Sequence, residues 1–397
     1  MITVDKKLDI QPIYDFGLLA PKERIVFFDI ETTGLKASAA SLYLIGAVTF
    51  EDGSWRLRQF FAESLADEEP LLDAFFDLIN EKKKNGRVFL ISYNGDGFDI
   101  PFLQNCIRQY ALGYSFSGLM SIDLLKKVRP FKTLSGLCDC KLKTVEKLCG
   151  IMREDRYNGG ELIYVYEEYL RMNAMYPGSL EDTPLNAKLK NHLLDTLLLH
   201  NAEDIADMPM IMQVLGYESL FAGDFEVTKS EVEDGVWDIH AKLKCPLPKG
   251  IYREMPDYTL SISEEDPYEL NLAVPLYEGE LKYFFVDYKN YYYLPAEDCA
   301  VHKSVGEFVD RKARKQATAR TCYQKKHGRF VPQPSPVFTP LFYQEYKGTA
   351  YGELKFMDAN ADGGDPSEAP EASETAGRCI GEKETRQYVC SLLETLK

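Results

Sequence analysis

The sequence predicts an α/β domain built on a mixed sheet, followed by a smaller β-rich domain. From residue 24 to about residue 220, apolar strand-like runs alternate with segments of helical periodicity. After residue 220 the runs are short and rich in aromatic and β-branched residues, with turns at Gly and Pro. The 397 residues leave room for two domains of ordinary size.

Three early strands, then alternating helices and strands, then a mostly helical stretch indicate a mixed sheet flanked by helices. The expected strands are 24–31, 42–50, 56–63, 87–94 and a short strand end at 121–125; the expected helices are 70–80, 99–112 and most of 142–215.

Composition sets the remaining boundaries. Residues 1–23 are predicted to be an N-terminal extension, and residues 221–357 the β-rich accessory domain. Residues 358–377 contain six acidic side chains and no aromatic or aliphatic residue larger than alanine, so they are expected to be a disordered spacer. Residues 378–397 are expected to form a short terminal helix.

The bulk charge and the cysteines exclude some classes of protein. A net charge of -16 argues against a protein that coats nucleic acid through bulk electrostatics, but not against an enzyme that grips a few nucleotides locally. Nine cysteines without a paired framework predict reduced thiols and a cytoplasmic location. The N-terminus lacks the apolar core of a signal peptide, and no run approaches the ~18 apolar residues of a membrane span.

The stretch "RIVFFDIETTGL" (24–35) places two carboxylates at the end of an apolar strand. Alternate strand residues face the same way, so Asp29 and Glu31 point to one side of the sheet. Two such carboxylates repel each other unless a cation lies between them. Gly34 then breaks the strand, which lets the backbone approach a ligand. The alternative interpretation is a helix-capping residue and a solvated turn acid.

Two further stretches place polar groups in similar positions. In "SYNGDGFDIPFL" (92–103), Asn94 and Asp99 follow the end of a strand, and Asp99 could also be a simple helix cap. In "LLDTLLLHNAEDIADMPMIMQVL" (193–215), His200 and Asp204 lie one helical turn apart on one face. Taken alone, His200 is more simply an ordinary histidine on a helix face.

Together the three stretches resemble the motifs of the DEDD superfamily of 3′→5′ exonucleases, and more narrowly the YprB-type bacterial RNase H-like domain. The resemblance covers about residues 22–218 and implies an RNase H-like fold. It implies that Asp29, Glu31, Asp99 and Asp204 bind two Mg²⁺ or Mn²⁺ ions. Asp29 would bridge both ions, Glu31 and Asp204 would hold one, and Asp99 would reach the other through water. Carboxylate oxygens suit such hard cations.

The same resemblance suggests catalytic and substrate-binding roles. The superfamily shows H-x-x-x-x-D or Y-x-x-x-D, whereas this chain has H-x-x-x-D. His200 could therefore be the general base, a water-orienting group or a structural residue. Thr32, Thr33 and Leu35 would line the site of the terminal nucleotide, although Leu35 could also be a core residue. Asn94 would steady the phosphate or the turn itself.

The accessory domain contains an unusual basic and aromatic region. Residues 301–330 carry nine Lys or Arg side chains against two acids, and "YFFVDYKNYYYLP" just before them is dense in aromatic rings. Rings beside cations are typical of single-stranded nucleic-acid binding. The alternative is a β core of tyrosines with a charged surface helix.

These observations predict a metal-dependent nuclease, most simply a 3′→5′ exonuclease that hydrolyses single-stranded DNA or RNA with two metal ions. One alternative is a catalytically idle RNase H-like scaffold that binds nucleic acid or protein. The other is a structure-selective endonuclease on the same fold.

Overall fold

The computed structural model of the chain describes residues 1–153, 159–175, 184–354 and 378–396. It divides into two compact units, residues 1–216 with 245–248, and residues 217–244 with 249–397. The predicted disordered spacer at 358–377 lies outside the described residues. None of the described helices is long and apolar enough to cross a membrane.

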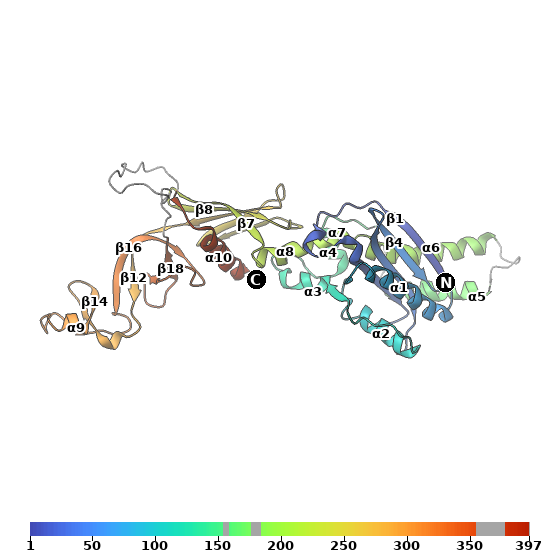
Figure 1. Ribbon diagram of the computed structural model, residues 1–397, viewed down its shortest axis with the longest axis horizontal. Helices are drawn as coiled ribbons and strands as arrows, with labels where there is room; N and C mark the ends of the chain where they lie inside the picture. The colour runs from blue at the N-terminus through green and yellow to red at the C-terminus, as the bar shows by residue number, and fades with distance from the viewer. Residues whose placement is uncertain (154–158, 176–183, 355–377, 397) are drawn as a thin grey trace. The chain divides into compact units, whose positions relative to one another are not determined.

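A six-stranded mixed sheet forms the centre of the first unit, with strand order β1-β4-β3-β2-β5-β6. Figure 1 labels two neighbouring strands of this sheet, β1 and β4. The three hairpin-linked strands of the sheet are antiparallel, and β5 and β6 run parallel to β2. The strands are β1 (Ile2–Leu8), β2 (Ile25–Thr32), β3 (Leu42–Glu51), β4 (Ser54–Phe61), β5 (Phe89–Ser92) and β6 (Met120–Asp123). The predicted mixed sheet is therefore confirmed.

Residues 1–23, which the sequence places outside this domain, contribute to the sheet. β1 pairs antiparallel with β4 along its whole length and becomes the edge strand. None of its residues is buried and three of the seven are charged, as an edge strand tolerates. The sequence gives no apolar run here, which is why composition alone does not identify a strand.

Helices cover both faces of this sheet. They are α1 (Glu68–Lys83), α2 (Asp99–Gln109), α3 (Leu124–Val128), α4 (Leu142–Leu148), α5 (Gly159–Met175), α6 (Pro184–Ala206) and α7 (Met208–Ile211). Helix α8 (Leu215–Phe221) begins in the first unit and ends in the second. Strand alternation divides β2 between two cores. Val26 and Phe28 pack with α1 and α2, whereas Ile25 and Phe27 pack with α3 and the segment from Ile205 to Leu215.

The second unit is rich in β structure. Its six-stranded sheet has the order β19-β7-β8-β11-β10-β9. The strands are β7 (Phe225–Glu233), β8 (Val236–Leu243), β9 (Ile251–Met255), β10 (Tyr258–Ile262), β11 (Glu269–Pro275) and β19 (Arg378–Cys379). The terminal helix α10 (Glu382–Leu393) packs on it, with the ring of Tyr388 centred 4.9 Å from that of Trp237.

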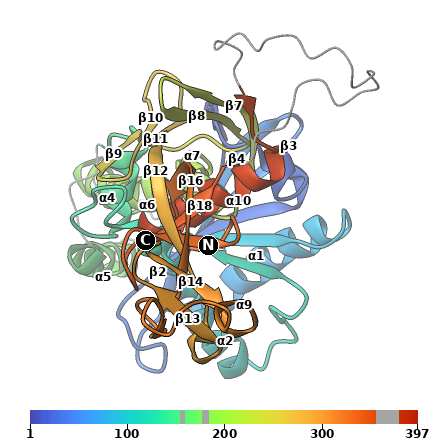
Figure 2. The same cartoon turned by 90° about the vertical axis from the view of Figure 1, so that its left-hand side faces the viewer.

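Two smaller β elements complete this unit. A closed four-stranded barrel contains β12 (Tyr277–Phe284), β16 (Tyr323–Pro332), β18 (Ala350–Glu353) and β17 (Leu341–Tyr343) (Figure 2). A three-stranded sheet contains β14 (Cys299–His302), β13 (Tyr291–Leu294) and β15 (Lys315–Gln316), and the single-turn helix α9 (Lys303–Gly306) packs on it.

Candidate active site

Asp29 and Glu31 lie at the carboxyl end of β2, the strand on which the sheet changes from antiparallel to parallel pairing. Both belong to the odd-numbered face of the strand, as the alternation predicts. A register shift between Glu31 and Thr32 ends the regular pairing with β3. Glu31 is buried and Asp29 half-buried, so both carboxylates sit at a strand end that is largely screened from solvent.

Asp99 joins this pair from the next strand-to-helix connection. It is the first residue of α2 and is buried, and its Oδ1 accepts a 3.1 Å hydrogen bond from the backbone N–H of Ile30. Phe98 occupies the N-cap position of α2 without a side-chain capping hydrogen bond, and the Asp99 carboxylate bonds to β2 instead, so Asp99 is not the simple helix cap of the alternative interpretation. Gly95 permits this close turn, because a Cβ there would lie 2.1 Å from Ser92 Oγ.

Helix α6 brings the third stretch to the same place. The buried His200 places its Nε2 3.7 Å from Glu31 Oε1 and 3.7 Å from Asp204 Oδ2. One ligand atom from each of Glu31, His200 and Asp204 lies within 4.8 Å of the others. These separations exceed hydrogen-bond length, and they would allow one cation to contact all three groups.

The electrostatics identify a cluster of acids that repel one another. Burial raises the pKa of Asp29 well above its ordinary value, and the charges of Asp99, Glu31 and Asp204 raise it further. Burial also raises the pKa of Asp99 to about 7, although the backbone N–H groups of Asp99 and Ile30 act in the opposite direction. A divalent cation would relieve this repulsion, and four carboxylates form a donor set that fits Mg²⁺ or Mn²⁺.

A buried arginine that the sequence analysis does not identify holds Asp204. Arg153 donates to Asp204 Oδ1 through Nη1 and to both carboxylate oxygens of the buried Glu146 through Nε and Nη2. Only 8% of the Arg153 side chain is exposed. The other oxygen of Asp204 remains directed toward His200. The sequence shows this region only as a basic stretch, without a signal that pairs Arg153 with Glu146.

Asn201 is a second residue that the sequence motifs do not single out. It follows His200 on α6, is fully buried, and donates a 3.1 Å hydrogen bond from Nδ2 to Asp29 Oδ2. The cluster therefore contains the five predicted residues Asp29, Glu31, Asp99, His200 and Asp204, together with two side-chain donors, Asn201 and Arg153, that each hold one carboxylate oxygen of these acids.

Comparison with known proteins agrees with this architecture. Residues 26–216 match the family model described as the RNase H superfamily. The mixed sheet and its helices over these residues are therefore an RNase H-like domain. No curated protein matches the chain.

Among solved structures, the chain is similar to E. coli exonuclease I in complex with a dT13 oligonucleotide, with 12% identity and a TM-score of 0.27 over 60% of this chain and 55% of that one. It is also similar to a product-bound structure of exonuclease I, with 13% identity and a TM-score of 0.28 over 63% and 64% of the two chains. The chain thus spans less than two thirds of the length of these exonuclease I chains.

The predicted substrate-binding residues Thr32, Thr33, Leu35 and Asn94 differ in their exposure and in their hydrogen bonds. Leu35 is 85% exposed, so the interpretation of Leu35 as a core residue is wrong. Thr32 Oγ1 donates to the carbonyl of Gly34, and Thr33 Oγ1 accepts from the N–H of Ser41, so both hydroxyls shape the turn. Asn94 has a left-handed backbone with φ of 68°, and its N–H donates to Asp123 Oδ1.

In the second unit, the basic region 301–330 is mainly strand and loop. The charged surface helix of the alternative interpretation is wrong, because the only helix of this fully described region is the single turn α9. Several of the cations and tyrosines already have partners: Arg314 lies 4.5 Å from the Tyr292 ring centre, and Lys325 pairs with Asp298. Phe308 is 91% exposed, beside the exposed cations Arg311 and Lys312.

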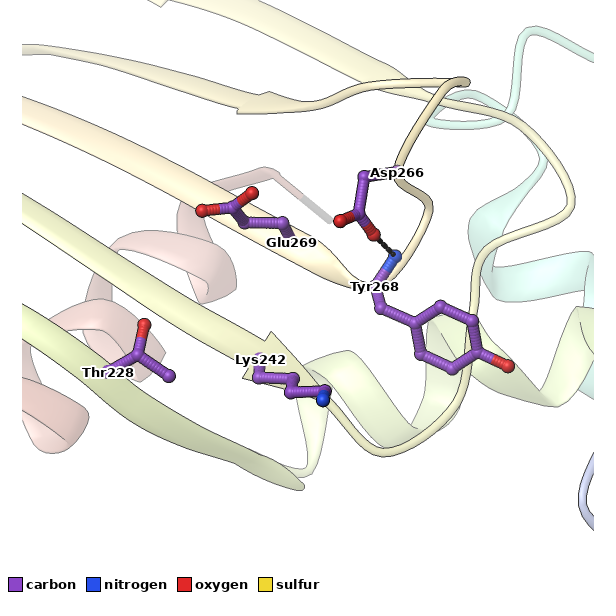
Figure 3. A pocket seen from close by; sticks show the side chains of 5 residues that line it. All are labelled: Thr228, Lys242, Asp266, Tyr268 and Glu269. Atoms are coloured by element: carbon purple, nitrogen blue, oxygen red, sulfur yellow. Dashed lines mark hydrogen bonds between the residues drawn. The ribbon is translucent and has the colours of Figure 1, made fainter.

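A separate hollow of about 560 Å³ opens on the second unit, on the polar face of its large sheet (Figure 3). Thr228, Lys242, Asp266, Tyr268 and Glu269 line it. Its acids and its lysine carry both signs of charge, unlike the acidic cluster of the RNase H-like domain. It is therefore not a second copy of that site.

Proposed function

We propose that this chain is a metal-dependent nuclease, and that it acts as a 3′→5′ exonuclease on single-stranded DNA or RNA. The observation that carries the proposal is the convergence of acids from three distant stretches of the RNase H-like domain. Glu31, His200 and Asp204 place ligand atoms within 4.8 Å of one another, and Asp29 and Asp99 are close enough to repel them. Acids crowded in this way are expected to bind cations.

Asp29, Glu31, Asp99 and Asp204 would hold two Mg²⁺ or Mn²⁺ ions. When bound, such ions supply a nucleophilic water at neutral pH and stabilise the leaving oxygen of the phosphodiester. The protein restricts how each carboxylate points: the Ile30 N–H holds one oxygen of Asp99, and Arg153 holds one oxygen of Asp204. The second carboxylate oxygen of Asp99 and of Asp204 can then bind a metal ion.

His200 is proposed to act on the attacking water. Its Nε2 lies 3.7 Å from a carboxylate oxygen of Glu31 and 3.7 Å from one of Asp204, so the imidazole can accept a proton from a water held beside these acids. The histidine stands in the H-x-x-x-D register, and the helical geometry of α6 brings it to the acids despite that spacing. A general-base role therefore fits its place in the cluster.

The substrate is proposed to be a nucleic-acid strand whose 3′ end enters beside Leu35. An exposed leucine on the loop after β2 can pack against a terminal base, and the Thr32 and Thr33 hydroxyls keep that loop in shape. In the second unit, the exposed Phe308 beside Arg311 and Lys312 has the composition of a site that stacks bases and contacts phosphates.

Two alternatives lead to different experimental results. A catalytically idle scaffold would bind nucleic acid or protein without cleaving it; the presence of all four acids favours an active enzyme. A structure-selective endonuclease would cleave internal bonds of a strand whose ends are blocked.

Incubation with 5′-labelled single-stranded DNA and RNA, each with Mn²⁺ or Mg²⁺, tests the proposal. We expect a ladder that shortens from the 3′ end, no cleavage in EDTA, and protection by a blocked 3′ terminus. Internal products from the blocked strand would indicate the endonuclease. The absence of cleavage on every substrate would contradict the enzyme proposal.

A further inference from the structure

Three residues on neighbouring strands of the RNase H-like domain form a row next to the side chain of Asn201: Asp29, Gly46 and Gln59. The register of β2, β3 and β4 places Asp29 opposite Gly46, and Gly46 opposite Gln59. Asn201, from α6, lies over Gly46 and bonds to both neighbours in the row. Its Nδ2 donates to Asp29 Oδ2 at 3.1 Å, and its Oδ1 accepts from Gln59 Nε2 at 3.0 Å.

Gly46 provides the space that Asn201 occupies. A Cβ at position 46 would lie 2.3 Å from Asn201 Oδ1 and 3.0 Å from its Cγ and Nδ2, and both residues are enclosed by the sheet and the helix. Gly46 does not have a left-handed backbone, so an alanine could adopt its conformation. The steric demand of Asn201 is the reason for a glycine here.

Gln59 determines which way the Asn201 amide faces. Gln59 Nε2 donates both to Asn201 Oδ1 and to the carbonyl of Leu198 at 2.8 Å, so it is the amino group of Gln59 that points to the helix. Asn201 must therefore turn its oxygen toward Gln59 and its own amino group toward Asp29. Through these two hydrogen bonds, Gln59 makes Asn201 present its amino group to Asp29, whose charged neighbours are acids.

We infer that Asn201 is a positioning residue that fixes the orientation of Asp29 for metal binding, seated by Gly46 and oriented by Gln59. The inference rests on the proposed function, because it assigns Asp29 as a metal ligand. By holding Oδ2, the amide leaves Oδ1 of Asp29 to face a cation. A hydrogen-bond partner of this kind orients a metal ligand before the metal arrives.

The first test measures Mn²⁺ affinity by calorimetry on the full chain, below its unfolding temperature. Asn201→Ala is expected to weaken Mn²⁺ binding about ten-fold and to lower kcat with little change in KM, as removal of an outer partner of a metal ligand typically does. Asn173→Ala is the matched control. Asn173 also bonds on both sides, to the carbonyl of Glu63 and to Lys190, at a distance from the acids in the same domain.

The second test acts through a residue that touches neither metal nor substrate. Gly46→Ala should displace the Asn201 amide and reproduce the loss of Mn²⁺ affinity. In the Asn201→Ala background the clashing amide is gone, so the same substitution should cause no further loss. Gly113→Ala is the control, because its Cβ would meet no atom within 4 Å.

Gln59→Met keeps the volume of this side chain and removes the donor that orients Asn201, so it provides a test even if Asn201→Ala does not fold. We expect a weakening of Mn²⁺ binding by a few-fold. Folded Asn201→Ala or Gln59→Met protein that binds Mn²⁺ within two-fold of wild type would overturn the inference and leave the proposed function standing. A wild-type protein that neither binds Mn²⁺ nor cleaves any strand would overturn both, and that failure appears before any variant is made.

Discussion

Asp29 in the RNase H-like domain and Asp298 in the β-rich unit have pKa values displaced in opposite directions. Burial and the charges of Asp99, Glu31 and Asp204 raise the pKa of Asp29. Hydrogen bonds from Lys325, Tyr293 and Tyr323 hold the pKa of Asp298 well below its ordinary value. The first acid has mainly acids around it, whereas the second is already satisfied by the fold.

The same contrast extends to the two sequence regions around these residues. The motif stretches bring like charges together from β2, α2 and α6, which is unfavourable unless a cation arrives. The aromatic stretch before residue 301 looks like a binding surface in sequence, yet Tyr293 donates its hydroxyl to Asp298 and Phe285 stacks on Tyr291. Repulsion between buried acids that the fold does not neutralise is therefore a better indicator of a ligand site than a run of aromatic residues in the sequence.

Asp29→Asn gives the largest expected effect and tests the contrast directly. Replacing a ligand that should contact both metal ions is expected to lower kcat by about a thousand-fold or more. The variant should remain folded, because the substitution removes repulsion. Asp298→Asn is the comparison: its hydrogen bonds from two tyrosines weaken, which should cost about 1 kcal/mol of stability and leave cleavage unchanged. Equal losses of activity in both variants would contradict the distinction.

The stability of the metal-free protein should depend on pH through Asp99. Its pKa of about 7 lies above the ordinary 3.8, so the protonated form is favoured in the folded state. The stability contributed by this carboxyl is fully present below pH 4 and is lost as the pH rises to 7, by on the order of a few kcal/mol.

Urea unfolding in EDTA from pH 4 to 8 would measure this. Asp99→Asn should make the fall in stability shallower, and the remaining slope should come from Asp29, whose pKa is also raised. Asp298→Asn should leave that part of the profile unchanged, because the lowered pKa of Asp298 affects stability only at lower pH. A wild-type stability that rises between pH 4 and 7 in EDTA would be inconsistent with the raised pKa of Asp99.

His200→Ala tests which role the histidine has within the acidic cluster. As a general base, it should contribute about a hundred-fold to kcat. Mn²⁺ affinity, measured in parallel, should change much less than kcat. A rate equal to that of wild type would show that His200 is structural, while the carboxylate site would still stand.

Phe308→Ala gives the smallest expected effect. It tests whether the aromatic and basic region around residues 301–330 can still bind a nucleic-acid strand. Stacking of one base is worth about 1–3 kcal/mol, so KM for a single-stranded oligonucleotide should rise at least five-fold with kcat unchanged. Tyr292→Leu is the comparison, because the Tyr292 ring is already engaged by Arg314 and its removal should leave KM unchanged. An unaltered KM for Phe308→Ala would remove this surface from the proposed substrate path.

Much of the fold and of the acidic cluster could be predicted, because both depend on local periodicity. Alternation along 24–31 places Asp29 and Glu31 on one face, and helical spacing places His200 near Asp204. The motif order then indicated an RNase H-like fold, which the match over residues 26–216 supports. β1 was missed because an exposed edge strand carries no apolar pattern.

The sequence by itself thus determined the sheet, its flanking helices and the identity of the acids, since periodicity and residue type are written along the chain. Only the tertiary structure decided that Gly46 faces Asn201, that Gln59 orients the Asn201 amide, and that Arg153, itself bound by Glu146, holds Asp204. These contacts join residues on different strands and helices. Their existence depends on strand register and helix packing, which no local pattern encodes.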